Sequence, residues 1–79
     1  MENKKIKIKL KSPERIKVFI NIVGKFKSDV DIMTDKTIID AKSIIGIFAL
    51  DLTSDVYVRI ISDDIAERRK FEAEMENFR

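Results

Sequence analysis

Histidine and cysteine, which carry much of the covalent and metal chemistry of proteins, are both absent from this 79-residue chain. Without them the chain forms no Ser-His-Asp or Cys-His arrangement, no disulfide and no thiolate metal site. No cluster of carboxylates replaces them, so we expect no metal, no cofactor and no enzymatic activity. The hydroxyl groups in the most defined settings are those of Ser12 and Ser43, each placed where a helix is predicted to begin.

A strand and a helix are predicted around Ser12. Apolar residues alternate with lysines from Ile6 through Ile8 to Leu10, a period of two that predicts a strand with one buried face. Ser12-Pro13-Glu14 then has the residue types of an N-cap and a first helical turn. The helix should end near Gly24 or Lys25. Its core-facing stripe follows at helical spacing and comprises Ile16, Phe19, Ile20, Val23 and Phe26.

The remaining elements are predicted by the same two periods. First come a strand over 29–33, with Val30 and Ile32 on one face, a turn over 34–37 and a strand over 38–41. Ser43 then caps a short helix that runs to about Leu50, and a fourth strand begins at Val56. The last helix starts at Asp63-Asp64, and its inward-facing residues are Phe71, Met75 and Phe78. The order β-α-β-β-α-β-α predicts an α+β fold, an open-faced two-layer β-sandwich whose four-stranded sheet carries three helices on one face.

Composition restricts the classes of function. Apolar residues make up 44% and charged residues 38%, a globular balance in a chain with room for one core, so residues 1–79 are predicted to form a single domain. No apolar run approaches the roughly 18 residues of a membrane span, and no signal peptide is visible, so we expect a cytoplasmic protein. The formal net charge of +2 is too small to argue by itself for nucleic acid.

The segment 37–50, with its run Ala41-Lys42-Ser43-Ile44-Ile45-Gly46, resembles the strand, serine and short helix of HPr, the histidine-containing phosphocarrier of the bacterial sugar phosphotransferase system. The resemblance is strongest from Phe26 to Ser62 and extends in pattern to both ends. It implies the HPr-like fold described above, a bacterial protein related to the phosphotransferase system, and partners among its proteins or among transcription regulators.

The same resemblance implies that this chain differs from the family at two positions of the active loop. That loop reads Gly-Leu-His-Ala-Arg-Pro-Ala in the family, and counting back from Phe26 puts its histidine position near Ser12 and its arginine position near Glu14. A serine phosphate ester is much more stable than a phosphoramidate, and a glutamate repels the phosphoryl group. The resemblance therefore implies a degenerate member without phosphohistidine transfer.

Ser43 matches the serine that a dedicated kinase phosphorylates in many HPr proteins of Gram-positive bacteria. A phosphate here would lie at a predicted helix N-terminus, where its charge is favourable. The alternative is that Ser43 serves only as an N-cap. The catabolite-repression HPr paralogue sets a precedent for the regulatory interpretation, because it lacks the histidine, keeps the serine and acts as a regulatory ligand.

Apolar residues on the first two predicted helices form a candidate partner-binding surface, which we call the helical apolar surface: Val18, Ile22, Ile44, Ile45 and Phe48. Val18 and Ile22 lie i, i+4 beside the core stripe, where the family is usually polar. Together these residues could bind a partner or a second copy of the chain. The alternative is that they widen the buried stripe.

A lysine-rich sheet face is the second candidate interface. Lys5, Lys7, Lys9 and Arg59 are predicted on the open face, together with Asp29 and Asp31, and the family's strand order lets Arg59 pair with an aspartate. The mixture of charges favours a solvated surface. We therefore predict a regulatory protein-binding module that uses the helical apolar surface, with a small nucleic-acid-binding domain as the alternative.

Overall fold

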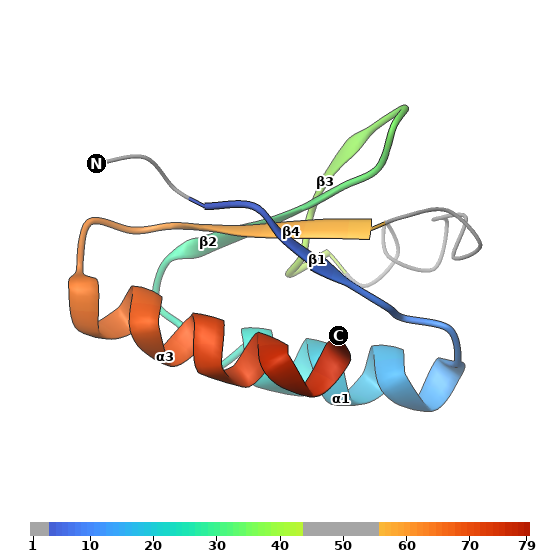
Figure 1. Ribbon diagram of the computed structural model, residues 1–79, viewed down its shortest axis with the longest axis horizontal. Helices are drawn as coiled ribbons and strands as arrows, with labels where there is room; N and C mark the ends of the chain where they lie inside the picture. The colour runs from blue at the N-terminus through green and yellow to red at the C-terminus, as the bar shows by residue number, and fades with distance from the viewer. Residues whose placement is uncertain (1–3, 44–55) are drawn as a thin grey trace.

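The computed structural model describes residues 4–43 and 56–79 of the chain (Figure 1). Their elements are β1 (Ile6–Ile8), α1 (Pro13–Val23), β2 (Asp29–Met33), β3 (Ile38–Asp40), β4 (Val56–Ile61), α3 (Ile65–Met75) and a terminal 3-10 turn (Glu76–Phe78). Apart from the helix predicted over 43–50, the strand and helix types and their order are those that the two sequence periods predict.

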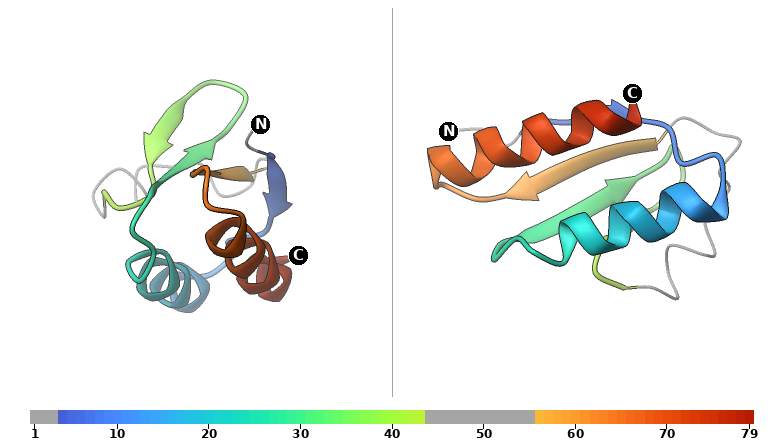
Figure 2. Two further views of the ribbon diagram at one scale, coloured as in Figure 1. Left: turned by 90° about the vertical axis from the view of Figure 1, so that its left-hand side faces the viewer. Right: turned by 90° about the horizontal axis from the view of Figure 1, so that it is seen from below.

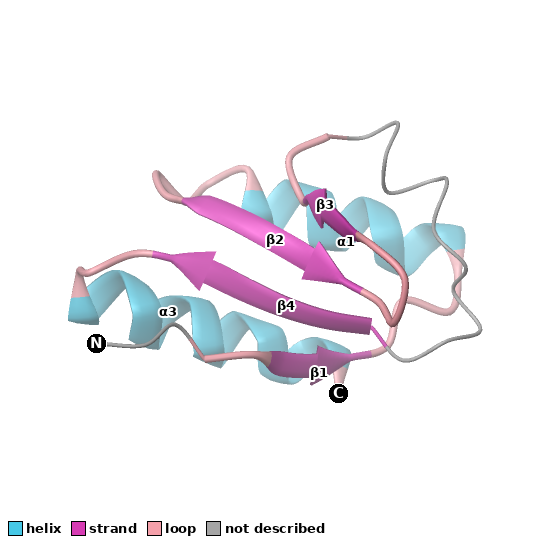
Figure 3. Ribbon diagram, turned by 90° about the horizontal axis from the view of Figure 1, so that it is seen from above, coloured by secondary structure: helices cyan, strands magenta, loops and turns pink. Residues whose placement is uncertain are grey.

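The four strands form one antiparallel sheet in the order β1-β4-β2-β3, so the last strand lies between the first and the second (Figure 3). The register places Ile6 opposite Val58, Val58 opposite Ile32, and Ile32 opposite Ile39. Ile6, Val58 and Ile32 are buried, and Ile39 packs against the core. One row of side chains on the core face therefore joins all four strands.

Helices α1 and α3 lie side by side on that face of the sheet and leave the other face open (Figure 2). Phe19 of α1 meets Phe78 edge to face, with ring centroids 5.6 Å apart, and Phe26 meets Phe71 of α3 in the same way at 5.5 Å. Such edge-to-face pairs add to the free energy gained from burial. These two contacts fix how the helices pack over the sheet.

Side chains from neighbouring residues set the start of both helices. Asp64, predicted to begin the last helix, is the N-cap of α3, and its Oδ1 accepts hydrogen bonds from Ala66 N at 2.9 Å and Glu67 N at 3.3 Å. Ser12 caps α1 in the same role. The sequence predictions of both helix starts are therefore confirmed.

Strand ends differ slightly from prediction. The period-two pattern extended the first strand to Leu10, but β1 ends at Ile8, because Lys9 N donates instead to Phe78 O at 2.6 Å. At the end of β3, Ala41 N still donates to Val30 O at 2.7 Å, so the chain continues beside β2 for one residue past Asp40. Leu10 is buried as the pattern predicted, and Ala41 is also buried.

The α+β fold with a four-stranded sheet and helices on one face is confirmed. The described residues contain two α-helices, α1 and α3, rather than three. The predicted helix from Ser43 to Leu50 lies outside them apart from Ser43 itself, which has no helical assignment.

Candidate functional site

Ser12, near which the family's histidine position was predicted, lies at the start of α1. Its backbone is extended, with φ −139° and ψ 155°, and its Oγ accepts a hydrogen bond from Arg15 N at 3.3 Å. Pro13, whose missing N–H costs nothing in the first turn, follows it. The Ser12 hydroxyl thus serves as a helix cap.

Glu14 and Arg15 are the charged side chains of the first turn of α1. Glu14 is exposed in the first turn of α1 and adds negative charge there. The guanidinium of Arg15 donates to Lys9 O at 3.0 Å and to Asn77 O at 3.3 Å, and its centre lies 5.5 Å from the centroid of the Phe78 ring. Arg15 therefore ties α1 to the C-terminal turn, a role that the sequence did not reveal because Asn77 lies 62 residues away.

Ser43, the predicted phosphorylation site, is exposed after a turn that Asp40 organises. Asp40 Oδ1 accepts from Lys42 N at 2.9 Å, and Asp40 O accepts from Ser43 N at 2.9 Å. Lys42 Nζ donates to Phe26 O at 2.9 Å and so attaches the turn to the segment after α1. Ser43 is thereby placed at the surface after the end of β3.

The helical apolar surface is only partly within the described residues. Val18 is 51% exposed, as a partner-binding residue should be. Ile22 is half-buried and packs against the core, which is also compatible with the alternative of a wider buried stripe. Ile44, Ile45 and Phe48 lie outside the described residues. The structure thus separates Val18 from Ile22, which the sequence had treated alike.

The open face of the sheet carries mixed charge, as predicted. Arg59 Nη2 contacts Asp31 Oδ2 at 3.0 Å, and Asp31 also lies opposite Asp40 across β2 and β3. Lys5, Lys7 and Lys9 are exposed. A pairing of Arg59 with an aspartate was predicted from the strand order and is confirmed.

An apolar row on this open face was missed. Met33 lies between Tyr57 of β4 and Ile38 of β3, and it is buried although it does not belong to the core under the helices. Ile38 is 64% exposed beside it. The signal was present in the sequence, since Met33 is one residue from the core-facing Ile32 and so must point to the other face.

The carboxylate of Glu67 of α3 accepts hydrogen bonds from residues of two other segments. Its carboxylate accepts from the hydroxyls of Ser28 at 2.5 Å and Ser62 at 2.7 Å, and from Ser28 N at 3.3 Å and Lys27 N at 3.0 Å. These bonds, led by the Ser28 hydroxyl, lower the pKa of Glu67 from 4.5 to about 2. Glu67 joins α3 to the segment before β2 and to the end of β4.

Among residues 4–43 and 56–79, no group of three acidic side chains could hold a metal ion. In the same part of the chain, no helix has the length and apolar character needed to cross a membrane.

Comparisons with known proteins agree with the fold. A crystal structure of "HPr-C-His" from Thermoanaerobacter tengcongensis is 28% identical, with a TM-score of 0.73 over 98% of this chain and 93% of that one. A phosphocarrier protein HPr from Bacillus anthracis str. Ames is 24% identical, with a TM-score of 0.72 over 99% and 96% of the two chains, and shows likeness of fold. No curated protein sequence matches.

The family whose sequence model matches is PTS-HPr, described as "PTS HPr component phosphorylation site", and the match covers residues 14–78. It begins two residues after Ser12, at the second residue of α1, and includes the rest of α1, the segment from β2 to β4, and α3. The resemblance noted in the sequence is thus confirmed over most of the chain, and the chain belongs to the HPr family of the phosphotransferase system.

Proposed function

We propose that this HPr-family domain does not transfer phosphohistidine and acts as a regulatory protein-binding module related to the sugar phosphotransferase system. The observation that carries the proposal is the absence of any histidine from the chain, together with the N-cap role of Ser12, which lies near the predicted histidine position. The proposal includes a cytoplasmic, bacterial setting and no enzymatic activity of its own.

The chemistry at the start of α1 supports the loss of transfer. An imidazole accepts a phosphoryl group while neutral and forms a labile phosphoramidate that can pass the group on. A serine hydroxyl would form an ester that is too stable for relay. Glu14 adds a negative charge in the first turn, and the guanidinium of Arg15 is held by Lys9 O and Asn77 O. Neither Glu14 nor Arg15 therefore offers a positive charge to an incoming phosphate.

Ser43 is the proposed regulatory phosphorylation site. Its exposure after the turn made by Asp40 and Lys42 supports access by a kinase. A phosphate would add about −1.5 to −2 charge at this position. Because Asp40 is exposed nearby, such a phosphate would also change the balance of charge at the end of β3.

The proposed partner-binding surface is the helical apolar surface, and the partner is a phosphotransferase-system or transcription-regulatory protein, or a second copy of the chain. Val18, exposed on α1, supports this assignment most directly. The nucleic-acid alternative is less favoured, because Asp31 pairs with Arg59 and only Tyr57 supplies an aromatic ring among the basic residues of the sheet face.

A comparison of two variants tests this assignment. The double variant Val18→Gln with Phe48→Ala should lower the affinity for the partner roughly thirtyfold, the change expected for loss of one interface anchor. It should therefore abolish capture of the partner from lysate, or dissociate a homodimer. The control changes Lys5, Lys7 and Lys9 together to Gln and should leave binding largely intact. If the lysine variant loses its partner and the apolar variant keeps it, the binding surface is the sheet face instead.

A further inference from the structure

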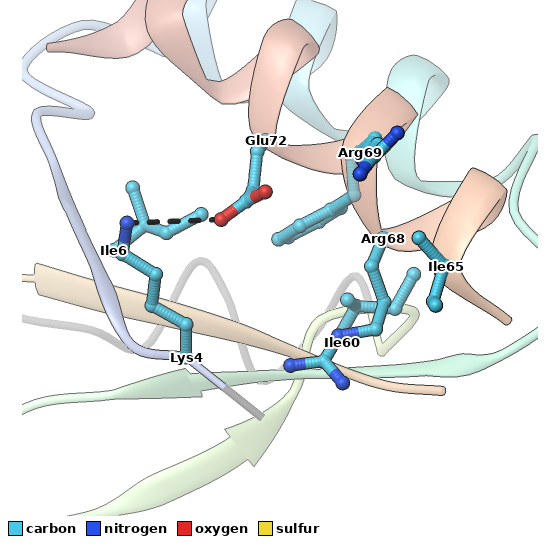
Figure 4. A pocket seen from close by; sticks show the side chains of 8 residues that line it. Lys4, Ile6, Ile60, Ile65, Arg68, Arg69 and Glu72 are labelled. Atoms are coloured by element: carbon cyan, nitrogen blue, oxygen red, sulfur yellow. Dashed lines mark ion pairs between the residues drawn. The ribbon is translucent and has the colours of Figure 1, made fainter. Parts of the chain in front are cut away.

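A pocket of about 200 Å³ lies between the edge strand β1 and helix α3 (Figure 4). Its apolar lining comes from Ile6 of β1, Ile60 of β4 and Phe71 of α3, all three buried, and from Ile65 at the start of α3. Ile65 is 50% exposed. The pocket thus has a buried apolar lining with one accessible apolar residue at its side.

The charged lining of this pocket is mostly basic. Lys4, Arg68 and Arg69 contribute positive charge, and Glu72 is the one carboxylate among the lining residues. Lys4 Nζ lies 3.7 Å from Glu72 Oε1, and both side chains are well exposed, so this ion pair is weak. A ligand carboxylate could compete with Glu72 for Lys4 and contact Arg69, which is exposed.

The basic character continues along β1. Lys7, Lys9 and Arg79 line a second, shallower pocket of about 300 Å³. Arg79 Nη1 contacts Glu76 Oε1 at 3.4 Å, again between exposed groups. A ligand that extends beyond the first pocket along this edge of the sheet therefore meets further positive charge, which favours an extended acidic chain over a compact ion.

We propose that the β1–α3 pocket binds one large apolar side chain of an acidic segment of a partner protein. The pocket is smaller than the roughly 300–1,000 Å³ of typical small-molecule sites and suits a single leucine- or phenylalanine-sized group. Acidic residues on either side of that group would contact Lys4 and Arg69. The positive charge of the lining favours an acidic segment, and the apolar lining favours a large apolar residue within that segment.

This site shares no residue with the helical apolar surface or with the Ser43 turn. It would give the domain a second, independent contact to a partner, and two linked contacts bind more tightly than either alone when both can form together. Failure of the β1–α3 site would leave the proposed function intact, because the tests of the two surfaces use different variants.

Titration followed by backbone amide NMR tests the proposal. The probe is a capped hexapeptide with the order Glu-Glu-Phe-Leu-Glu-Glu. Two control peptides replace its central residues with two serines or its glutamates with lysines. We expect the probe to shift the signals of Ile65, Arg69 and Glu72 saturably, and neither control to do so. If the serine peptide binds equally well, charge attraction alone accounts for binding, and the claim that the pocket holds an apolar side chain is overturned.

A matched pair of variants locates the contact. Arg69→Glu should weaken binding of the probe by about tenfold or more, because it removes a cation from the pocket and adds a repulsive charge. Lys70→Glu makes the same change of net charge on the next residue, which does not line this pocket, and should weaken binding by less than about twofold. Equal losses in the two variants would overturn the location.

Two further measurements decide the class of the occupant. If 4-phenylbutyrate saturates the same signals as tightly as the peptide, the site is one for small carboxylates and the protein partner is wrong. If the signals shift with protein concentration in the absence of peptide, a second copy of the chain occupies the pocket. Binding by the peptide alone supports the proposal.

Discussion

Ser62 Oγ donates to Glu67 Oε1 over 2.7 Å and at the same time accepts from Asp64 N at 3.1 Å. Ser62 thereby connects the cap of α3 to the carboxylate that also receives the Ser28 hydroxyl. The end of β4, the start of α3 and the segment before β2 are joined through one half-exposed glutamate.

This arrangement predicts an acid-dependent loss of stability. Because the pKa of Glu67 falls from 4.5 to about 2 on folding, its carboxylate stabilises the fold fully above about pH 4.5, and that contribution is lost as the pH falls toward about 2. In urea unfolding, Glu67→Gln should lower the midpoint at pH 7 and make it less dependent on pH across this window. Glu74→Gln, the same change on the same helix, is the control and should keep the wild-type slope. Equal slopes for wild type and Glu67→Gln would contradict the role of this carboxylate.

The ion pair on the open sheet face should be weakly stabilising. Arg59 and Asp31 are 29% and 25% exposed, and their contact at 3.0 Å is short. A double-mutant cycle with Arg59→Gln and Asp31→Asn should give a coupling free energy of about 0.5–1 kcal/mol that falls in high salt. The more exposed pair of Lys4 and Glu72, at 3.7 Å, serves as the comparison and should give a smaller coupling. A larger coupling in that pair would show that exposure does not control these interactions.

Much of the scaffold was predictable because its signals are local. The alternation of Ile6 and Ile8 with lysines, and the Ser12-Pro13-Glu14 start of α1, depend on neighbouring residues alone. The pairing of Arg59 with an aspartate needed one further assumption, the strand order of the family, and the structure has that order.

The unpredicted features depend on residues that only folding brings together. The carboxylate of Glu67 has partners 39 and 40 residues away, and the guanidinium of Arg15 has one 62 residues away. Val18 and Ile22 illustrate a different limit. They stand one turn apart beside the same core stripe, and the depth at which α1 packs decides that Ile22 is half-buried and Val18 exposed. The sequence pattern of α1 alone does not predict how deeply the helix packs against the sheet.

Ser43 should be the sole target of a cognate HPr kinase. Ser43 is exposed after the turn of Asp40, whereas Ser12 is half-buried at the start of α1. Mass spectrometry after incubation with kinase and ATP should find one phosphate, and Ser43→Ala should abolish it. Modification of Ser12 or Ser54 with Ser43 untouched would refute the assignment.

The charge at the start of α1 can be tested by restoring the family's residues. Ser12→His alone should accept little phosphate from the first enzyme of the phosphotransferase system, because Glu14 still repels the phosphoryl group. The double variant Ser12→His with Glu14→Arg should accept it faster. A tenfold difference in rate would correspond to about 1.4 kcal/mol. Equal rates for the two variants would show that Glu14 does not limit transfer.

The most direct test of the central claim is incubation of the unaltered protein with that first enzyme and labelled phosphoenolpyruvate, with an ordinary HPr as the positive control. A phosphohistidine is labile in acid and a phosphoserine is not, so acid treatment separates the two products. The absence of histidine predicts that this chain carries no acid-labile label while the control is labelled. Acid-labile label on this chain would contradict the loss of phosphocarrier chemistry.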